Sequence, residues 1–398
     1  MIKNLEATAI YFFWLACVLN PAPSDYKFKI ISLFIMLALL GVRILDINSA
    51  KLKKPYALYL FFFLLFVLLG TFVALIRGGF SGSFIDTSYY TSALYFIASG
   101  LYFYSKNYTV ALKAMVFSLR VIVFLIIYSF FIVYTGIESV ILQFFVDIGS
   151  AYIGMRNYGG FEFYYIYYIV SPMLIFLICY DMYFILKRKG RLYILLLALS
   201  VTAMFLSGTR ANMLLSVFTP ICLLMWFYAG RYAYFFISIV TVFFILLVFA
   251  LKIPVFYEMF NPEEVSNSDK LGYLSGYIEI FSNLSYFLFG QGFNAHVWDL
   301  NIYSMIPDGA SKTELTYLEM VRVFGFLGAS LFAFGFLYLV FSNRIHYSIA
   351  PWIGPALFIY LLVSSTNPYI FSSNGMLLLG LGVASLSFHR TNYLVNRK

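Results

Sequence analysis

Three arginines stand at places where a guanidinium group would be held near an apolar segment. Arg156 belongs to the glycine-rich stretch 154–160, and Arg210 belongs to the short connector 207–212. Arg322 lies about two helical turns inside a later apolar segment. The planar fork of an arginine side chain matches the oxygens of a phosphate or pyrophosphate group. These positions therefore predict the binding of an anionic ligand of this kind.

Simpler interpretations are open for some of the arginines. Arg322 follows Glu319 by three residues, so the two side chains would form an ion pair within one helix. Arg77 ends another apolar segment and has the position of an ordinary flanking anchor. The alternatives to ligand binding are therefore pairing for Arg322 and anchoring for Arg77.

Three other residues could take a proton from a substrate hydroxyl group. His296 closely follows the glycine turn 289–294. Glu314 begins an apolar segment, and Glu319 lies about one turn further along it. A histidine or a carboxylate within hydrogen-bonding distance of a hydroxyl group can act as a general base. The alternatives are that His296 is a surface histidine without a role and that either glutamate only neutralises an arginine.

Several familiar kinds of site are missing from the sequence. It contains no Asp-x-Asp, no P-loop, no Gly-x-Ser-x-Gly and no group of His, Cys or Asp with the spacing of metal ligands. The three cysteines, Cys17, Cys179 and Cys222, all fall inside apolar segments, so we expect packing residues and no disulfide. The sequence therefore predicts a site without a metal or another cofactor.

The segments around these side chains are those of a membrane protein. The chain is 63% apolar and 11% charged, whereas a water-soluble domain is about half apolar and about a quarter charged. A bilayer is crossed by about 20 apolar residues in a helix. The twelve predicted spans are 5–22, 27–44, 55–76, 88–105, 112–135, 162–186, 191–207, 211–229, 232–251, 314–341, 349–364 and 375–389. We expect an all-α polytopic membrane protein of about 12 transmembrane helices, forming a single integral membrane domain over residues 1–398.

The distribution of charge gives this domain an orientation. Lysine and arginine are concentrated in every second connector, most densely at 187–191 and 51–54, and most acidic residues lie in the other connectors. By the positive-inside rule, the basic connectors and both termini are cytoplasmic. Arg156 and Arg210 then lie outside, against the usual bias, so simple anchoring explains them less well. The basic cytoplasmic connectors and their attraction to anionic lipid account for the net charge of +9. A nucleic-acid partner is therefore not needed to explain this charge.

Two outer connectors are long enough to hold structure of their own. The loop 136–161 carries apolar and polar residues on opposite faces of a helical repeat, which predicts an amphipathic helix along the outer membrane surface. The loop 252–313, expected to be periplasmic, is the longest hydrophilic stretch, and we expect a second interfacial helix within it. The apolar residues at helical spacing in this second loop are Leu271, Leu274, Ile278 and Phe281.

Several groups of residues occur in an order that resembles one superfamily of membrane enzymes. They are Ser207-Gly208-Thr209-Arg210, Phe289-Gly290-Gln291-Gly292-Phe293, Glu314 to Glu319 with Phe324-Gly325-Phe326-Leu327-Gly328, and Asn367-Pro368-Tyr369 with Ser373-Asn374-Gly375. In order, spacing and expected topology, residues from about 150 to 390 resemble the bacterial O-antigen polymerase (Wzy) and O-antigen ligase superfamily.

The resemblance implies an enzyme of the bacterial inner membrane. Such a glycosyltransferase moves a glycan from undecaprenyl pyrophosphate to the non-reducing end of another lipid-linked repeat unit, and so polymerises a surface polysaccharide. Arg210, Arg156 and Arg322 are then expected to bind the pyrophosphate. His296 or Glu314 would accept the proton of the acceptor hydroxyl group. The implied partners are the lipid-linked oligosaccharide and the lipid bilayer, with room for a chain-length regulator.

Two other functions remain open. An O-antigen ligase would transfer the finished glycan to the core of lipid A instead of extending a lipid-linked unit. A polysaccharide transporter or lipid flippase would share the topology of twelve spans with both ends inside, and would be expected to show repeated halves and ionisable residues near the bilayer midplane.

Overall fold

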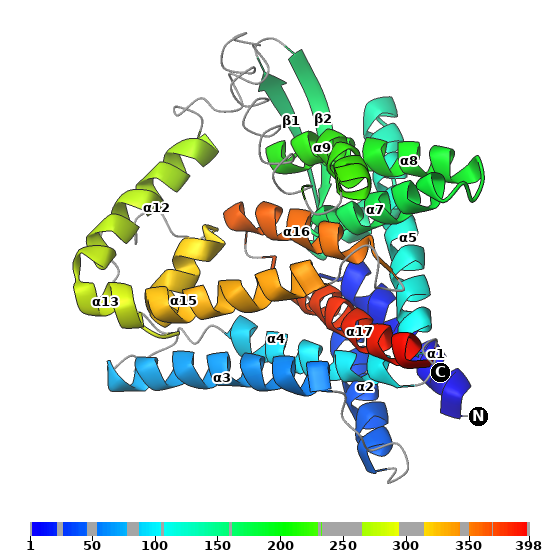
Figure 1. Cartoon of the computed structure of the whole chain (residues 1–398). Helices are drawn as coiled ribbons and strands as arrows, with labels where there is room; N and C mark the ends of the chain where they lie inside the picture. Colours follow the sequence, from blue (N-terminus) through cyan, green and yellow to red (C-terminus); the bar gives the residue numbers. More distant parts are fainter. Residues whose placement is uncertain are drawn as a thin grey trace.

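The structure, a computed structural model, is built almost entirely of α-helices (Figure 1). It describes residues 2–21, 27–45, 54–77, 87–104, 107–158, 161–229, 232, 265–293, 314–342, 350–367 and 369–395. Within these residues there are 14 α-helices and one sheet of two antiparallel strands.

The elements follow the chain in three groups. The first is α1 (Ile2–Leu19), α2 (Phe28–Leu45), α3 (Lys54–Ile76), α4 (Thr87–Ala98) and α5 (Asn107–Thr135). The second is α6 (Val140–Asp147), the strands β1 (Ala151–Tyr158) and β2 (Phe161–Tyr168), α7 (Leu174–Leu186), α8 (Leu192–Leu206) and α9 (Arg210–Ala229). The third is α12 (Val265–Ser282), α13 (Leu284–Phe289), α15 (Thr316–Ser342), α16 (Ile353–Val363) and α17 (Ser373–Val395).

Five of these helices are long and apolar enough to cross a membrane. They are Phe28–Leu45, Lys54–Ile76, Asn107–Thr135, Arg210–Tyr228 and Thr316–Ser342. Every predicted span except 232–251 contains a described helix, and 232–251 lies almost entirely outside the described residues. The chain is therefore a mainly helical protein with apolar, membrane-type helices, while the count of twelve spans and the cytoplasmic termini stay predictions.

The β-hairpin departs from the all-α expectation. One span was predicted over 162–186, but its first part is strand β2, paired antiparallel with β1, and the helix begins only at Leu174. The glycine-rich stretch 154–160 is likewise mostly strand. The physical reason is composition, because β2 consists of aromatic residues with one isoleucine and one glutamate, and aromatic and β-branched side chains favour strands.

A helix, α6, lies within 136–161, and its predicted place along the outer membrane surface stays a prediction. The hydroxyl group of Ser139 accepts a hydrogen bond from the backbone N–H of Leu142, which caps the first turn. Val140 and Ile141 are exposed on α6, whereas Leu142 and Phe145 are buried. An exposed apolar side of this kind suits contact with lipid.

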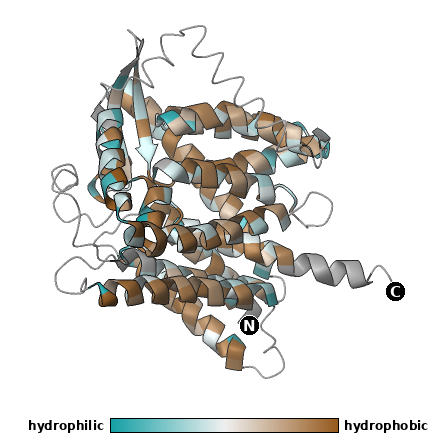
Figure 2. Cartoon of the chain, turned by 60° about the vertical axis from the view of Figure 1, so that its left-hand side comes forward, coloured by the Kyte–Doolittle hydropathy of each residue, from teal (hydrophilic) through white to brown (hydrophobic). Residues whose placement is uncertain are grey.

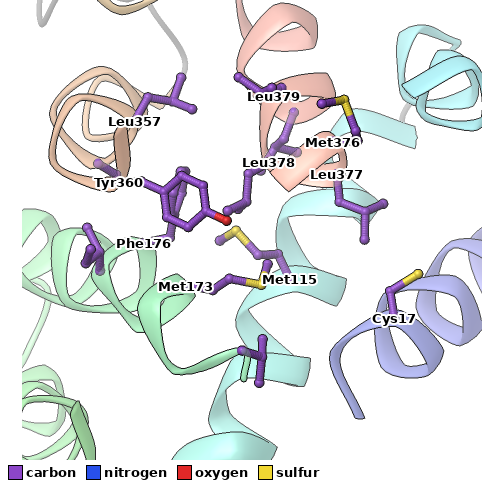
Figure 3. Close-up of a cluster of buried hydrophobic side chains, with 14 of the residues drawn as sticks. Cys17, Met115, Met173, Phe176, Leu357, Tyr360, Met376, Leu377, Leu378 and Leu379 are labelled. Atoms are coloured by element: carbon purple, nitrogen blue, oxygen red, sulfur yellow. The ribbon is translucent and has the colours of Figure 1, made fainter. Parts of the chain in front are cut away.

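Apolar side chains fill the interior and also cover much of the outside. Figure 2 shows helices that are hydrophobic along most of their length. In the interior, Met115 of α5, Phe176 of α7, Tyr360 of α16 and Leu377 of α17 meet in one cluster (Figure 3). Cys17, Cys179 and Cys222 are all buried, as predicted for packing residues.

Candidate functional site

The connector between α8 and α9 is a rigid turn. Gly208 has a φ of +69°, a conformation that favours glycine, and its N–H donates to the carbonyl oxygen of Phe205 at 3.1 Å. Thr209 then caps α9, since its hydroxyl oxygen accepts from the backbone N–H of Asn212 at 3.2 Å. Arg210 is thereby fixed as the first residue of α9.

The hairpin packs directly on this turn. A Cβ atom added to Gly208 would lie 2.0 Å from the Cβ atom of Tyr165, so only glycine leaves room for the strand. The guanidinium carbon of Arg156 lies 5.1 Å from the centre of the Tyr165 ring, within the range of a cation–π contact. Tyr165 therefore brings Arg156, from β1, into the neighbourhood of Arg210.

Helix α12 connects the start of α9 to the start of α15. Asn267 accepts a hydrogen bond from Nη1 of Arg210 through its amide oxygen. One turn later, Nζ of Lys270 lies 3.6 Å from a carboxylate oxygen of Glu314. Both contacts come from the same side of α12, because residues three apart are neighbours on a helix. This helix lies beside α13 and α15 at one edge of the molecule (Figure 1).

Helix α12 lies within the loop 252–313, where a helix is predicted. The predicted apolar stripe faces outward, with Leu271 and Ile278 exposed, whereas Tyr273 and Tyr277 are buried on the inner side. The outward stripe suits a membrane surface, as expected for an interfacial helix, and that location stays a prediction.

Arg322 lies in a buried layer beneath α12. Its Nε donates to Glu319 at 2.9 Å, its Nη2 contacts the other oxygen of that carboxylate, and the hydroxyl group of Tyr277 donates to Glu319 at 2.7 Å. The ion pair within one helix, given above as the simpler interpretation, is therefore present. With only 1% of the Arg322 residue exposed, its position favours holding the site together over contacting a ligand.

The glycine turn after α13 is inserted at a kink in α15. Gly325 interrupts α15 with φ +70° and ψ +170°. Beside it, the N–H of Gln291 donates to the carbonyl oxygen of Arg322 at 2.6 Å, and the N–H of Gly292 donates to that of Val323 at 3.0 Å. A Cβ on Gly290 would lie 2.4 Å from the same Val323 oxygen. The turn 289–293 and the segment that contains Gly325, two of the groups on which the resemblance is based, thus pack against each other.

Glu314 lies on the exposed end of the site, near a pair of tyrosines. The hydroxyl groups of Tyr167, in β2, and Tyr369 are 2.7 Å apart. Burial raises the pKa of Tyr167 to about 12, and the negative charge of Glu314 adds to this. Burial also raises the pKa of Tyr369, so both phenols are protonated at neutral pH and can donate hydrogen bonds. Thr316 donates to the carbonyl oxygen of Asn367 at 2.8 Å, which holds the loop of Tyr369 against α15.

The structure brings three of the predicted residues to one region. Arg156, Arg210 and Glu314 are joined through Tyr165, the 207–212 turn and α12, whereas Arg322 lies buried nearby. The predicted His296 lies outside the described residues. Among the residues that the structure describes, no group of three His, Cys, Asp or Glu could hold a metal ion.

Three residues that contact the predicted site residues are not predicted from the sequence. Asn267 contacts Arg210 and Lys270 contacts Glu314, and the apolar periodicity of α12 does not include these two polar positions. Their spacing of three residues, which places both on one helix face, was the available signal. Tyr165 lies in strand β2, within a segment whose hydropathy predicts a membrane span.

Arg77, which follows the end of α3, contacts residues of α13, and its anchoring role at a membrane stays a prediction. It donates to the backbone and hydroxyl oxygens of Ser285 at 3.2 and 2.9 Å, and its guanidinium carbon lies 4.6 Å from the ring centre of Tyr286. These contacts fasten the end of α3 to α13.

Comparison of the chain with protein-family models, with curated proteins and with solved structures finds no match. The geometry of this site is therefore the basis for assigning a function.

Proposed function

We propose that this chain is a membrane glycosyltransferase that polymerises lipid-linked repeat units of a surface polysaccharide. The observation that carries the proposal is that Arg156 lies over the Tyr165 ring, which packs on Gly208, two residues before Arg210, in a bundle of apolar helices. A pyrophosphate carries at least two negative charges, and it fits two guanidinium forks better than it fits a single anchor residue.

Arg210 and Arg156 are suited to stabilise a pyrophosphate leaving group. As the bond between the sugar and undecaprenyl pyrophosphate breaks, negative charge grows on the phosphate oxygens. Donors that are already held in place stabilise this charge without having to reorganise. Arg210 is held by its position at the start of α9 and by Asn267, and the positive end of α9 adds to its effect.

Glu314 is the described residue best placed to accept the proton of the attacking hydroxyl group. Its side chain is 54% exposed, so an acceptor sugar can reach it. Its carboxylate lies 3.6 Å from Nζ of Lys270. The hydroxyl oxygen of the acceptor sugar forms a bond to the donor sugar carbon, its proton passes to the base, and the pyrophosphate leaves with the bonding electrons. His296 remains the second candidate for this base.

The setting of the proposed reaction is the outer face of a bacterial inner membrane. The substrate is an oligosaccharide on undecaprenyl pyrophosphate, the bilayer holds its lipid tail, and a chain-length regulator is a further protein partner. Arg322 has a positioning role in this proposal, because it supports the kink in α15 from its buried pair with Glu319.

Reconstitution of the purified chain tests the proposal directly. Proteoliposomes containing undecaprenyl-pyrophosphate-linked repeat units should produce glycans of two or more units on the same lipid, resolved by gel electrophoresis and mass spectrometry. Vesicles without the protein are the control. If no chains lengthen and the glycan is instead transferred to added lipid A core, the protein is a ligase.

One observation favours the transporter alternative. The ion pair of Arg120 and Asp181 lies between α5, α7 and α8, inside the bundle, and ionisable residues within membrane spans mark substrate or proton pathways in many transporters. The same vesicles distinguish this function, because a transporter would move the lipid-linked unit to the opposite leaflet without lengthening it.

A further inference from the structure

One face of the β-hairpin is turned toward the candidate site. Side chains alternate between the two faces of a strand, and residues paired across two strands share a face. The residues on this face are Tyr152, Gly154 and Arg156 from β1 and Phe163, Tyr165 and Tyr167 from β2. Tyr165 packs on Gly208 and Tyr167 contacts Tyr369. The opposite face carries Ile166 and Tyr168, which are buried.

The tyrosines of this face form a continuous surface. The rings of Tyr152 and Tyr167 are stacked, with centroids 6.2 Å apart and planes inclined by 24°. Tyr152 is 50% exposed, so its ring is open to a ligand. The paired hydroxyl groups of Tyr167 and Tyr369 continue the surface toward Glu314, whose negative charge acts on both phenols.

This combination of groups matches a carbohydrate. A pyranose ring has an apolar face of C–H groups, which packs on an aromatic ring, and a rim of hydroxyl groups. Tyrosine supplies both an apolar face and a polar hydroxyl group. An ionised carboxylate such as Glu314 accepts hydrogen bonds from hydroxyl groups, and a phenol can donate or accept.

We propose that this tyrosine face, Tyr152, Tyr167 and Tyr369 with Glu314 at its edge, binds the glycan of the lipid-linked substrate. The inference rests on the proposed function. Arg156 lies four residues from Tyr152 on the same face of β1, a distance of about 13 Å along a strand. The pyrophosphate is thus bound toward Arg156 and Arg210, and the sugars extend along the hairpin toward Tyr152.

Saturation-transfer NMR on the full-length protein in detergent tests this binding site. The probe is the lipid-free repeat-unit oligosaccharide, released by mild acid from the lipid-linked pool of the host cell. The wild type should transfer magnetisation to the sugar protons. Tyr152→Ala should weaken binding at least about tenfold, because the open ring is lost. Tyr152→Phe, which keeps the ring, should bind within about threefold of the wild type.

The hairpin offers a matched control on its other face. Tyr164 is also an exposed tyrosine of β2, at 44%, but it pairs with Met155 on the opposite face. Tyr164→Ala should therefore leave glycan binding unchanged. Equal binding by the Tyr152→Ala variant and the wild type would overturn the inference, as would an equal loss from both alanine variants. If Tyr152→Ala does not fold, Tyr152→Leu replaces it with the same expectation.

The two proposals fail in different ways. A wild-type protein that lengthens lipid-linked chains, but whose glycan binding does not depend on Tyr152, overturns this inference and leaves the polymerase function standing. A protein that binds the glycan through Tyr152 but never lengthens a chain supports the binding face and contradicts the polymerase.

Discussion

Arg120 and Arg210 show two ways in which this chain holds an arginine. Arg120 lies within α5 and donates to the carboxylate of Asp181 in α7. It also donates to the hydroxyl group of Ser200 in α8, at 2.9 Å. Arg210 begins α9 and donates to the amide oxygen of Asn267. The partner of Arg120 is a carboxylate inside the bundle, whereas Asn267 is a neutral partner that reaches Arg210 from α12.

The difference is between an arginine that joins helices and one that the proposed function assigns to a ligand. The Asp181 side chain is completely buried, and a buried charge is tolerated only when it is paired and hydrogen-bonded. Arg210 is half-buried and follows the turn of Gly208, on which Tyr165 packs, and a second arginine, Arg156, lies over the Tyr165 ring. We infer that burial and position in the fold, more than the arginine itself, decide which of the two roles the residue has.

Removal of Arg120 is the strongest test of this comparison. Arg120→Ala leaves the Asp181 carboxylate buried without this partner, and we expect the free energy of unfolding to fall by about 3–5 kcal/mol. The double variant Arg120→Met with Asp181→Leu removes both charges, and should recover most of that loss. Both variants are compared by thermal unfolding in detergent and by the amount of protein in the membrane.

The double variant also tests whether this pair has a role beyond stability. If Arg120 and Asp181 only join helices, the double variant should lengthen glycan chains at close to the wild-type rate. A double variant that is stable but inactive would place the pair in the functional pathway, as the transporter alternative requires. A single variant as stable as the wild type would contradict the structural role.

Arg210→Ala should have the opposite result, a large loss of activity with little loss of stability. We expect chain lengthening to slow by about 100-fold or more, which is the usual effect of removing one preorganised donor to a developing negative charge. Arg210→Lys keeps the charge but loses the planar fork, so its activity should fall between those of the wild type and the alanine variant. The rate of chain growth in proteoliposomes measures both effects.

A charge on the other side of the proposed membrane provides the control. Lys189 is exposed in the connector between α7 and α8, and Lys189→Ala removes one positive charge far from the proposed site in the expected topology. This variant should lengthen chains at the wild-type rate. Normal activity of Arg210→Ala, at wild-type protein levels, would end the assignment of Arg210 to the pyrophosphate.

The parts of the site that could be predicted from the sequence are those with local causes. The rigid turn that carries Arg210 follows from Gly208 and from Thr209, a good helix cap. The pair of Glu319 and Arg322 follows from their spacing of three residues. The positions of the apolar helices follow from hydropathy, because an apolar segment in lipid must pair its backbone N–H and C=O groups with each other, and a helix does this.

The parts that could not be predicted depend on contacts between distant segments. Hydropathy alone does not distinguish the aromatic strand β2 from a membrane helix, and the partner strand β1 decides the outcome. The contact of Asn267 with Arg210 joins residues 57 positions apart, and no local pattern predicts it. The insertion of the 289–293 turn at Gly325 is likewise visible only once the chain is folded.

Lys270→Ala tests the weakest part of the comparison. The Lys270 and Glu314 side chains are 28% and 54% exposed and their charged atoms are 3.6 Å apart, and an ion pair so open to solvent contributes about 0–1 kcal/mol. Thermal stability should therefore be unchanged. Chain lengthening should slow by about two- to fivefold, because one positive charge near the pyrophosphate is lost.

Salt distinguishes this effect of Lys270 from the effect of Arg210. Screening shortens the range of electrostatic interactions to about 3 Å at 1 M ionic strength, so the wild type and Lys270→Ala should become equally active there. The loss in Arg210→Ala should persist, since direct hydrogen bonds to a bound phosphate are screened much less than the field of an exposed charge. A Lys270→Ala defect that is as large as that of Arg210→Ala and independent of salt would show that Lys270 contacts the substrate directly, and that α12 belongs to the binding site itself.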